Sequence, residues 1–139
     1  MRPTEITGFL GLYQLQFLDE NIQKREENFL FIEKTMNGND CLLKLKHSHI
    51  KRLSTFAIPV LCKNEKIKEK YKEIFSNAEI ETRPMIAGNI QNQPFYHNYV
   101  SRIYDLPETD FIHNNGFYCG NYPEMIKEEL EVIKNCLKK

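Results

Sequence analysis

Apolar residues recur at helical spacing from Thr4 to about Asn37, in a stretch that contains no proline. The first half, TEITGFLGLYQLQFL, is apolar on nearly every side, whereas the following NIQKREEN is polar. This pattern predicts one long helix that begins deep in protein and ends near water. Gly8 and Gly11 each weaken a helix by roughly 1 kcal/mol unless another backbone or a neighbouring subunit packs closely against them. The turn sequence NGND ends the helix.

Beyond this helix, short strand patterns alternate with helix patterns. Strands are expected at Ser54–Cys62, Ala78–Pro84 and Gly116–Gly120, and helices at Lys63–Ser76 and from NYPEM to Lys139. Four segments are less regular: CLLKLKHSHIKRL fits a strand or a loop, Met85–Tyr96 has turn chemistry, His97–Tyr104 fits one or two helical turns, and Leu106–Asn115 is expected to be a loop. We therefore predict an α+β fold, with helices packed on one side of a small antiparallel sheet.

The composition favours a single globular domain. A chain of 139 residues, 41% hydrophobic and 12% aromatic, is long enough for one core and too short for two ordinary domains. We therefore take residues 1–139 as one domain. Nineteen basic and nineteen acidic residues cancel, so the chain as a whole has no net charge that would attract nucleic acid or an anionic membrane.

Cysteine usage and hydropathy bear on the compartment. The four cysteines show no CxxC spacing, and no signal peptide pattern stands upstream of them. No apolar run approaches the roughly 20 residues that span a bilayer. We therefore expect a soluble, cytoplasmic protein with reduced thiols and no membrane partner.

Three features carry candidate chemistry, and each has a plainer interpretation. His47 and His49 form an HxH pair suited to a metal, but no acidic or thiol partner stands at ligand spacing, which favours an exposed polar stretch. The basic residues around them lack interleaved aromatics, which favours a solvated surface over phosphate binding. Cys119 has only His113 nearby in sequence to activate it, so a buried thiol is favoured over a nucleophile.

The segment ETRPMIAGNIQNQPFY, Glu81–Tyr96, is crowded with side-chain amides but carries no charge after Arg83. Amides and a guanidinium on a loop fixed by proline suit hydroxyl-rich or phosphorylated small molecules. The alternative is structural, because amides also cap the backbone of a loop that lies beside a core. The residues alone leave both interpretations open, and they contain no complete catalytic constellation.

Three segments resemble one known family. The opening MRPTEITGFLGLYQLQFLDENIQKREENF contains a Leu-Asp-x-x-Ile-x-x-Arg pattern, formed by Leu18, Asp19, Ile22 and Arg25. It resembles the long-helix segment of the DegT/DnrJ/EryC1/StrS family of sugar aminotransferases. ETRPMIAGNIQNQPF resembles the family's substrate loop, most closely in the branch that holds nucleotide-deoxysugar dehydratases of lipopolysaccharide synthesis alongside aminotransferases. GFYCGNYPEM and the helix after it resemble the family's C-terminus.

The resemblance implies the small C-terminal domain of a fold-type I enzyme that depends on pyridoxal phosphate. Family members have a larger N-terminal domain that supplies the cofactor aspartate, a ring-stacking aromatic and the Schiff-base lysine, or the histidine that replaces it in dehydratases. Met1 matches the middle of a full-length member, so that domain is expected to be absent here. We therefore expect this chain alone to bind no pyridoxal phosphate, and the large domain to come from elsewhere or from a homodimer partner.

The resemblance also implies where a nucleotide-activated sugar would bind. The residues expected to contact or border that substrate are Arg83, Asn89, Gln93, His113 and Asn114. Arg2 follows the position of the family's cofactor-phosphate asparagine and would reach the neighbouring subunit's cofactor site. We expect no catalytic residue and no metal ligand in this chain.

Two classes of function follow. The first is the sugar-nucleotide-binding part of an aminotransferase or a dehydratase of lipopolysaccharide or deoxysugar biosynthesis, without independent catalysis. The second is a free-standing binding or interaction module. The position that separates an aminotransferase from a dehydratase, lysine or histidine, lies outside the segments that match.

Overall fold

A computed structural model describes residues 4–86 and 88–138 of the chain. In chain order the elements are α1 (Glu5–Leu15), α2 (Leu18–Asn37), β1 (Ala57–Leu61), α3 (Glu65–Asn77), β2 (Thr82–Pro84), η1 (Ile90–Asn92, a 3₁₀ turn), α4 (Tyr96–Tyr99), α5 (Pro107–Asn115), β3 (Gly116–Gly120) and α6 (Lys127–Cys136). The three strands form one antiparallel sheet in the order β1-β3-β2. The predicted α+β class and antiparallel sheet are confirmed.

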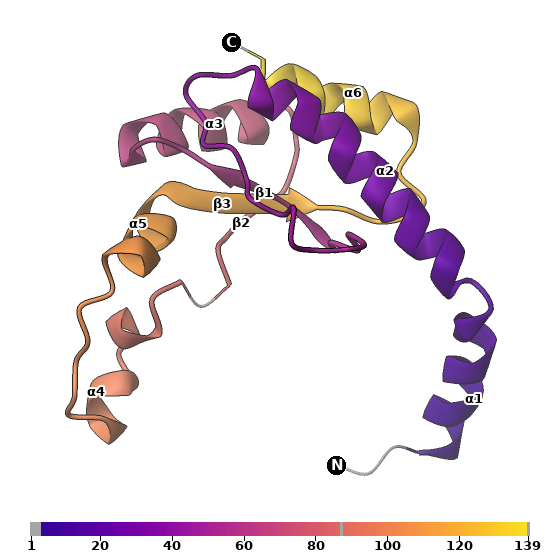
Figure 1. Cartoon of the computed structure of the whole chain (residues 1–139), viewed down its shortest axis with the longest axis horizontal. Helices are drawn as coiled ribbons and strands as arrows, with labels where there is room; N and C mark the ends of the chain where they lie inside the picture. The colour runs from indigo at the N-terminus through magenta and orange to yellow at the C-terminus, as the bar shows by residue number, and fades with distance from the viewer. Residues whose placement is uncertain (1–3, 87, 139) are drawn as a thin grey trace.

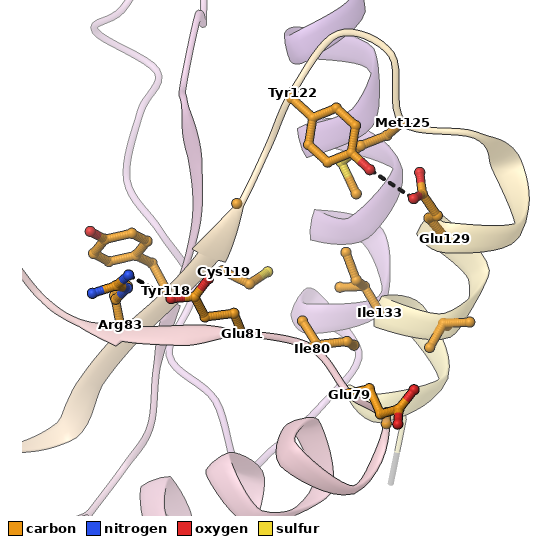
Figure 2. A pocket seen from close by; sticks show the side chains of 13 residues that line it. Glu79, Ile80, Glu81, Arg83, Tyr118, Cys119, Tyr122, Met125, Glu129 and Ile133 are labelled. Atoms are coloured by element: carbon orange, nitrogen blue, oxygen red, sulfur yellow. Dashed lines mark hydrogen bonds and ion pairs between the residues drawn. The ribbon is translucent and has the colours of Figure 1, made fainter.

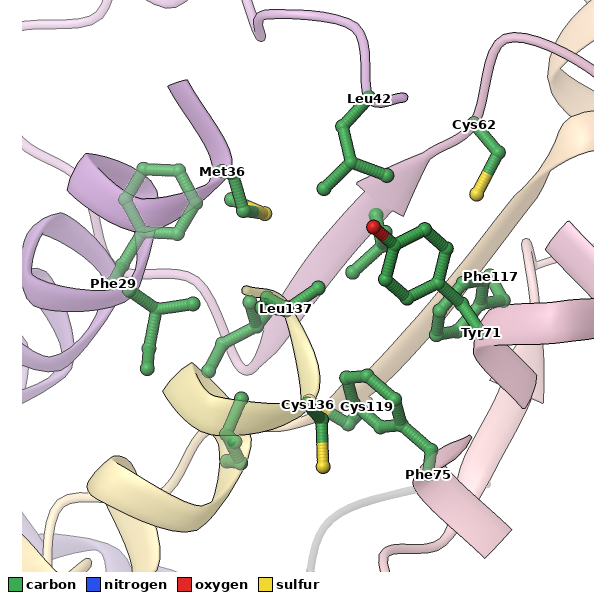
Figure 3. Close-up of a cluster of buried hydrophobic side chains, with 14 of the residues drawn as sticks. Phe29, Met36, Leu42, Cys62, Tyr71, Phe75, Phe117, Cys119, Cys136 and Leu137 are labelled. Carbon is green, nitrogen blue, oxygen red and sulfur yellow. The ribbon is translucent and has the colours of Figure 1, made fainter. Parts of the chain in front are cut away.

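The core lies on one face of this sheet, under α2, α3 and α6 (Figure 1). Side chains alternate between the two faces of a strand, so Ile58 and Val60 of β1 and Phe117 and Cys119 of β3 all point toward these helices and are buried. Phe117 meets Phe75 of α3 edge to face, with ring centroids 5.4 Å apart. Figure 3 shows Phe117 and Cys119 among side chains of the three helices.

No helix of the described residues covers the opposite face of the sheet (Figure 1). Pro59, Tyr118 and Arg83 lie in register across it, one from each strand. Two projections flank this open face in Figure 1: α1 on one side, and the segment that carries α4 and α5 on the other.

The first helix is broken, in contrast to the single helix predicted from Thr4 to Asn37. α1 ends at Leu15 and α2 begins at Leu18. Gln16 Nε2 donates to the backbone oxygen of Tyr13 (2.8 Å), which satisfies a carbonyl that the helix end leaves without an intrahelical partner. The expectation that the apolar half lies deep in protein is also wrong for this chain, because no residue of α1 is buried.

An apolar helix without cover should cause self-association. Six large apolar side chains of α1, from Ile6 to Leu15, are 56–74% exposed, and an added Cβ at Gly8 or Gly11 would meet nothing within 4 Å. We expect the chain to associate at neutral pH, since its formal net charge of zero provides no opposing repulsion. Leu12→Lys should shift it toward monomer. Sedimentation equilibrium over a concentration series measures this, and a monomer of 16.5 kDa at every concentration would contradict it.

The segment Leu106–Asn115, predicted to be a loop, is instead α5. Pro107 stands in its first turn, where a missing N–H costs nothing, and Glu108 and Asp110 are acidic residues near the positive end of the helix dipole. These are helix-start signals on a segment whose apolar periodicity is weak.

The remaining predicted strands and helices are confirmed with shifted ends, and so is the NGND turn. The CLLKLKHSHIKRL segment is a loop except for one bridge between Leu42 and Cys62.

A buried amide joins α2 to the end of the sheet. Asn121 follows β3, is 2% exposed, and donates through Nδ2 to the backbone oxygens of Arg25 (3.0 Å) and Thr55 (2.9 Å). Its Oδ1 accepts from Asn28 Nδ2 (3.3 Å). This junction orients α2 relative to β3 and to the loop before β1.

No helix of the described residues is long and apolar enough to cross a membrane.

Candidate functional site

The amide-rich segment is organised around Asn89, which is 3% exposed. Its Nδ2 donates to Asp110 Oδ1 on α5 (2.7 Å), and its Oδ1 accepts from the backbone N–H of Gln91 (3.0 Å). The second bond caps η1, since Asn89 is the residue before this turn. Asn89 therefore fastens the loop to α5, which favours the structural interpretation for this particular amide.

A second buried amide closes the loop at its far end. Gln91 is 4% exposed, donates through Nε2 to the backbone oxygen of Tyr104 (2.9 Å), and accepts through Oε1 from the N–H of Tyr104 (2.7 Å). This two-way bond holds the chain after α4 against η1. Asn92 is exposed, and its Nδ2 also donates to Asp110 Oδ1 (3.1 Å).

His113 is held in one tautomer by the same loop. Its Nδ1 accepts from the backbone N–H of Asn89 (3.2 Å), so in this arrangement the ring proton is on Nε2, which remains able to donate. Gly88 makes the approach possible: it has φ +53°, and a Cβ there would stand 2.0 Å from Nδ1 of His113. The structure thus brings Asn89 and His113 together.

The other predicted site residues make different contacts. Arg83 is on β2, exposed, and its Nη2 pairs with Glu81 Oε1 at 2.6 Å; it lies beside Tyr118 (Figure 2). Gln93 is half-buried and ends η1. Asn114 is exposed, and its backbone oxygen accepts from Lys68 Nζ (2.7 Å). Arg2 lies outside the described residues.

A separate cavity of about 580 Å³ opens between the chain leading into β2, the end of β3 and the start of α6 (Figure 2). Its lining includes Ile80, Glu81, Tyr118, Cys119, Glu129 and Ile133. We call this cavity the β2–α6 groove. Among the predicted site residues that the structure describes, only Arg83 lines it.

A carboxylate and a phenol are paired at one end of this groove. Tyr122 Oη donates to Glu129 Oε1 (2.7 Å), and Glu129 Oε2 accepts from the N–H of Ile126 (2.9 Å). The bond from Tyr122 and then the backbone bond lower the pKa of Glu129, while its carboxylate raises the pKa of Tyr122. At neutral pH the pair is therefore a carboxylate beside a neutral phenol.

The structure bears on the remaining candidates one by one. The exposed polar stretch predicted for the HxH pair is wrong for His47, which is half-buried with its Nε2 2.6 Å from Glu33 Oε1, while His49 is exposed. Residues 4–86 and 88–138 contain no group of three or more His, Cys, Asp or Glu side chains placed to hold a metal ion. The basic residues around His47 are exposed. Cys119 is 1% exposed, and burial raises its pKa to about 12, so its thiol is not ionised at neutral pH and does not act as a nucleophile.

Residues that sequence reasoning missed hold the site together. Asp110 anchors two amides of the loop from 18 and 21 positions away, and the backbone of Tyr104 pairs with Gln91. A helix-start pattern at Pro107–Asp110 was the available signal that would have placed an acidic side chain on a rigid element near the loop.

Comparisons with known proteins identify relatives along the whole chain. A model of the DegT/DnrJ/EryC1/StrS aminotransferase family matches residues 1–138. The lipopolysaccharide biosynthesis protein RfbH of Salmonella typhimurium (strain LT2) is 28% identical over 137 residues, which cover 96% of this chain and 31% of that protein. The GDP-4-keto-6-deoxy-D-mannose 3-dehydratase of Escherichia coli O55:H7 is 21% identical over 140 residues, which cover 99% of this chain and 36% of the dehydratase.

Solved structures share the fold. The E. coli GDP-4-keto-6-deoxy-D-mannose-3-dehydratase with bound hydrated PLP matches with a TM-score of 0.86 at 22% identity, over 99% of this chain and 36% of that one. Helicobacter pylori PseC, an aminotransferase involved in the biosynthesis of pseudoaminic acid, matches with a TM-score of 0.80 at 21% identity, over 99% and 37%. The chain thus spans about a third of the length of the proteins it matches.

Proposed function

Because the chain belongs to the DegT/DnrJ/EryC1/StrS aminotransferase family, we propose that it is the sugar-nucleotide-binding part of a pyridoxal-phosphate-dependent aminotransferase or dehydratase of deoxysugar biosynthesis. The observation that carries this proposal is the loop fastened to α5 through Asn89, Asp110 and His113. Its geometry is set by buried bonds within the chain, so the groups it presents are ordered before a ligand arrives.

The loop and β2 offer the groups that such a substrate needs. His113 retains a donor at Nε2, and the exposed Asn92 retains a carbonyl oxygen as acceptor, so together they complement hydroxyl groups, which donate and accept. Arg83 is exposed on the neighbouring strand β2, where it pairs with Glu81. When a diphosphate takes the place of Glu81, the guanidinium of Arg83 keeps a charge-assisted hydrogen bond. Gln93 and Asn114 border this region.

We infer that the described residues do not hold pyridoxal phosphate by themselves. When bound, pyridoxal phosphate supplies an electron sink for bonds broken next to an amine. The family resemblance implies that a lysine or a histidine contacts this cofactor. The lysine that reaches this region, Lys68, donates Nζ to the backbone oxygen of Asn114, and its side chain is 14% exposed. Lys68 therefore caps α5, and we assign the cofactor to a large domain in the same or another chain.

A chimeric enzyme tests this function. Residues 4–138 would replace the matching segment of the E. coli 3-dehydratase, whose structure they follow with a TM-score of 0.86. In this chimera we expect Arg83→Ala to lower kcat/KM by about 10 to 150-fold, since a charge-assisted contact contributes about 1.5–3 kcal/mol. Cofactor absorbance and melting temperature should stay nearly unchanged. Steady-state kinetics and visible spectra on the same preparations measure all three quantities.

Arg52→Ala is the matched control, because Arg52 is an exposed arginine whose partner, Asp19 at 3.6 Å, lies on α2 and not in the loop. It should leave kcat/KM within about twofold. Equal kinetics for the Arg83→Ala and parent chimeras would contradict the assignment of Arg83 and would favour a free-standing binding module.

A further inference from the structure

We propose that the β2–α6 groove binds a small organic cation with an apolar or aromatic body, at a site separate from the amide-rich loop. The groove lies at the end of the sheet, where β3 extends past the start of β2 (Figure 2). Of the residues assigned to sugar-nucleotide binding, only Arg83 touches it, at its edge. The proposal is independent of the function proposed above.

The interior of the groove is apolar and of ligand size. Its volume of about 580 Å³ falls within the range of about 300–1,000 Å³ that is typical of small-molecule sites. Ile80 and Met125 form part of its wall, with Val132 and Ile133 from successive positions of α6. Ile133 is anchored in the core at 4% exposure, so this wall is held in place before a ligand binds.

The lining is acidic overall. Glu79, Glu81 and Glu129 are three carboxylates against one guanidinium, that of Arg83, which leaves a net charge of −2. The ion pair of Glu81 with Arg83 accounts for one carboxylate (2.6 Å). Glu79 and Glu129 remain as the negative groups of the groove, at different places along its wall (Figure 2). Glu79 is held by its backbone, with φ +58° and an N–H bond to the oxygen of Ser76 at the end of α3.

One tyrosine ring adds the recognition that ammonium groups favour, because the faces of aromatic rings attract cations. Tyr122 lines the groove beside Glu129, whereas the ring of Tyr118 lies beside Arg83, on the other side of β3 (Figure 2). The bonds that Glu129 accepts from Tyr122 and from Ile126 keep it ionised at neutral pH and leave further acceptor capacity on both oxygens.

The same features disfavour anions. A nucleotide sugar carries a diphosphate, which the two unneutralised carboxylates would repel, so the groove and the amide-rich loop select ligands of opposite charge. Apolar walls, the ring of Tyr122 and carboxylates together select a protonated amine joined to a hydrophobic group.

Tryptamine is a suitable probe, because the chain contains no tryptophan and the indole alone reports binding by fluorescence. Equilibrium dialysis is unaffected by self-association of the chain. We expect saturable binding of tryptamine, and binding of indole-3-acetate, its anionic counterpart, that is at least tenfold weaker. The double substitution of Glu79→Gln and Glu129→Gln should weaken tryptamine binding about tenfold.

Two further variants distinguish the groove from other surfaces. Glu128→Gln removes a neighbouring exposed carboxylate of α6 that does not line the groove and should leave binding unchanged. Val132→Lys places a positive charge in the wall of the groove, at a side chain that is 43% exposed, and should weaken tryptamine binding at least tenfold while the melting temperature is retained. Equal affinity for tryptamine and indole-3-acetate, or full tryptamine binding by a folded Val132→Lys chain, would overturn the proposal.

Discussion

Replacing Phe117 with alanine is expected to lower the free energy of unfolding by about 3–5 kcal/mol, the usual cost of emptying a large aromatic site in a core. Phe117 is 1% exposed, lies on the central strand, and packs edge to face on Phe75. Neighbouring strands on both sides fix its backbone, so the cavity cannot close by a shift of β3. Urea unfolding followed by circular dichroism measures the change, in the Leu12→Lys background to limit association.

Phe95→Ala is the matched control, because Phe95 is 52% exposed and does not belong to the core cluster. It should change the free energy of unfolding by less than about 1 kcal/mol. A loss at Phe117 no greater than the loss at Phe95 would show that β3 is not the centre of the folded sheet.

Replacing Asn89 with alanine is expected to release the amide-rich loop while the core stays folded. The substitution removes the bond to the carboxylate of Asp110 and leaves the buried N–H of Gln91 without its acceptor. Together these losses should cost about 2–4 kcal/mol. Because the loop has few buried apolar side chains, it can open locally. Hydrogen exchange at the amide of Tyr104, which Gln91 Oε1 holds, should accelerate by about 30 to 1000-fold.

Asn98→Ala serves as the comparison, since Asn98 is an exposed amide of α4. Exchange at Tyr104 should then change by less than about threefold. If Asn89→Ala also left exchange at Tyr104 unchanged, the fastening role of Asn89 would be wrong, and the direct substrate contact expected from the family resemblance would be the better explanation. Exchange and chimera kinetics on the same variant therefore separate the two roles of this amide.

Periodicity predicted those parts of the fold in which a helix or strand buries one face. Ile67, Tyr71 and Phe75 recur at helical spacing in α3, and the buried residues of β1 alternate. α5 was missed because its apolar residues follow no clear stripe, and its evidence is the start signal at Pro107 and Asp110. The break after Leu15 was missed because apolar residues continue at helical spacing through it. Apolar spacing carries no information about which groups bond the free backbone carbonyls at a helix end.

The residue types of the candidate site could be predicted from the sequence, but the hydrogen bonds between them could not. The amides of Glu81–Tyr96 were recognisable as groups that need partners. Which of them would be buried depended on Asp110 and Tyr104, whose positions are set by α5 and by the turn after α4. The β2–α6 groove was invisible for the same reason, since it is made of three segments that only the sheet order brings together.

The position of β3 also determines when the domain can assemble during synthesis. Within residues 4–86 and 88–138, β1 and β2 do not pair with each other, and each pairs only with β3, which the ribosome makes after both. A nascent chain that ends before Gly116 therefore carries β1 and β2 with unpaired edges, because the central strand of the sheet is missing. The sheet closes once Gly116–Gly120 emerges, and the core is sealed only when α6 follows. Until then the exposed edges are sites for chaperone binding and for aggregation.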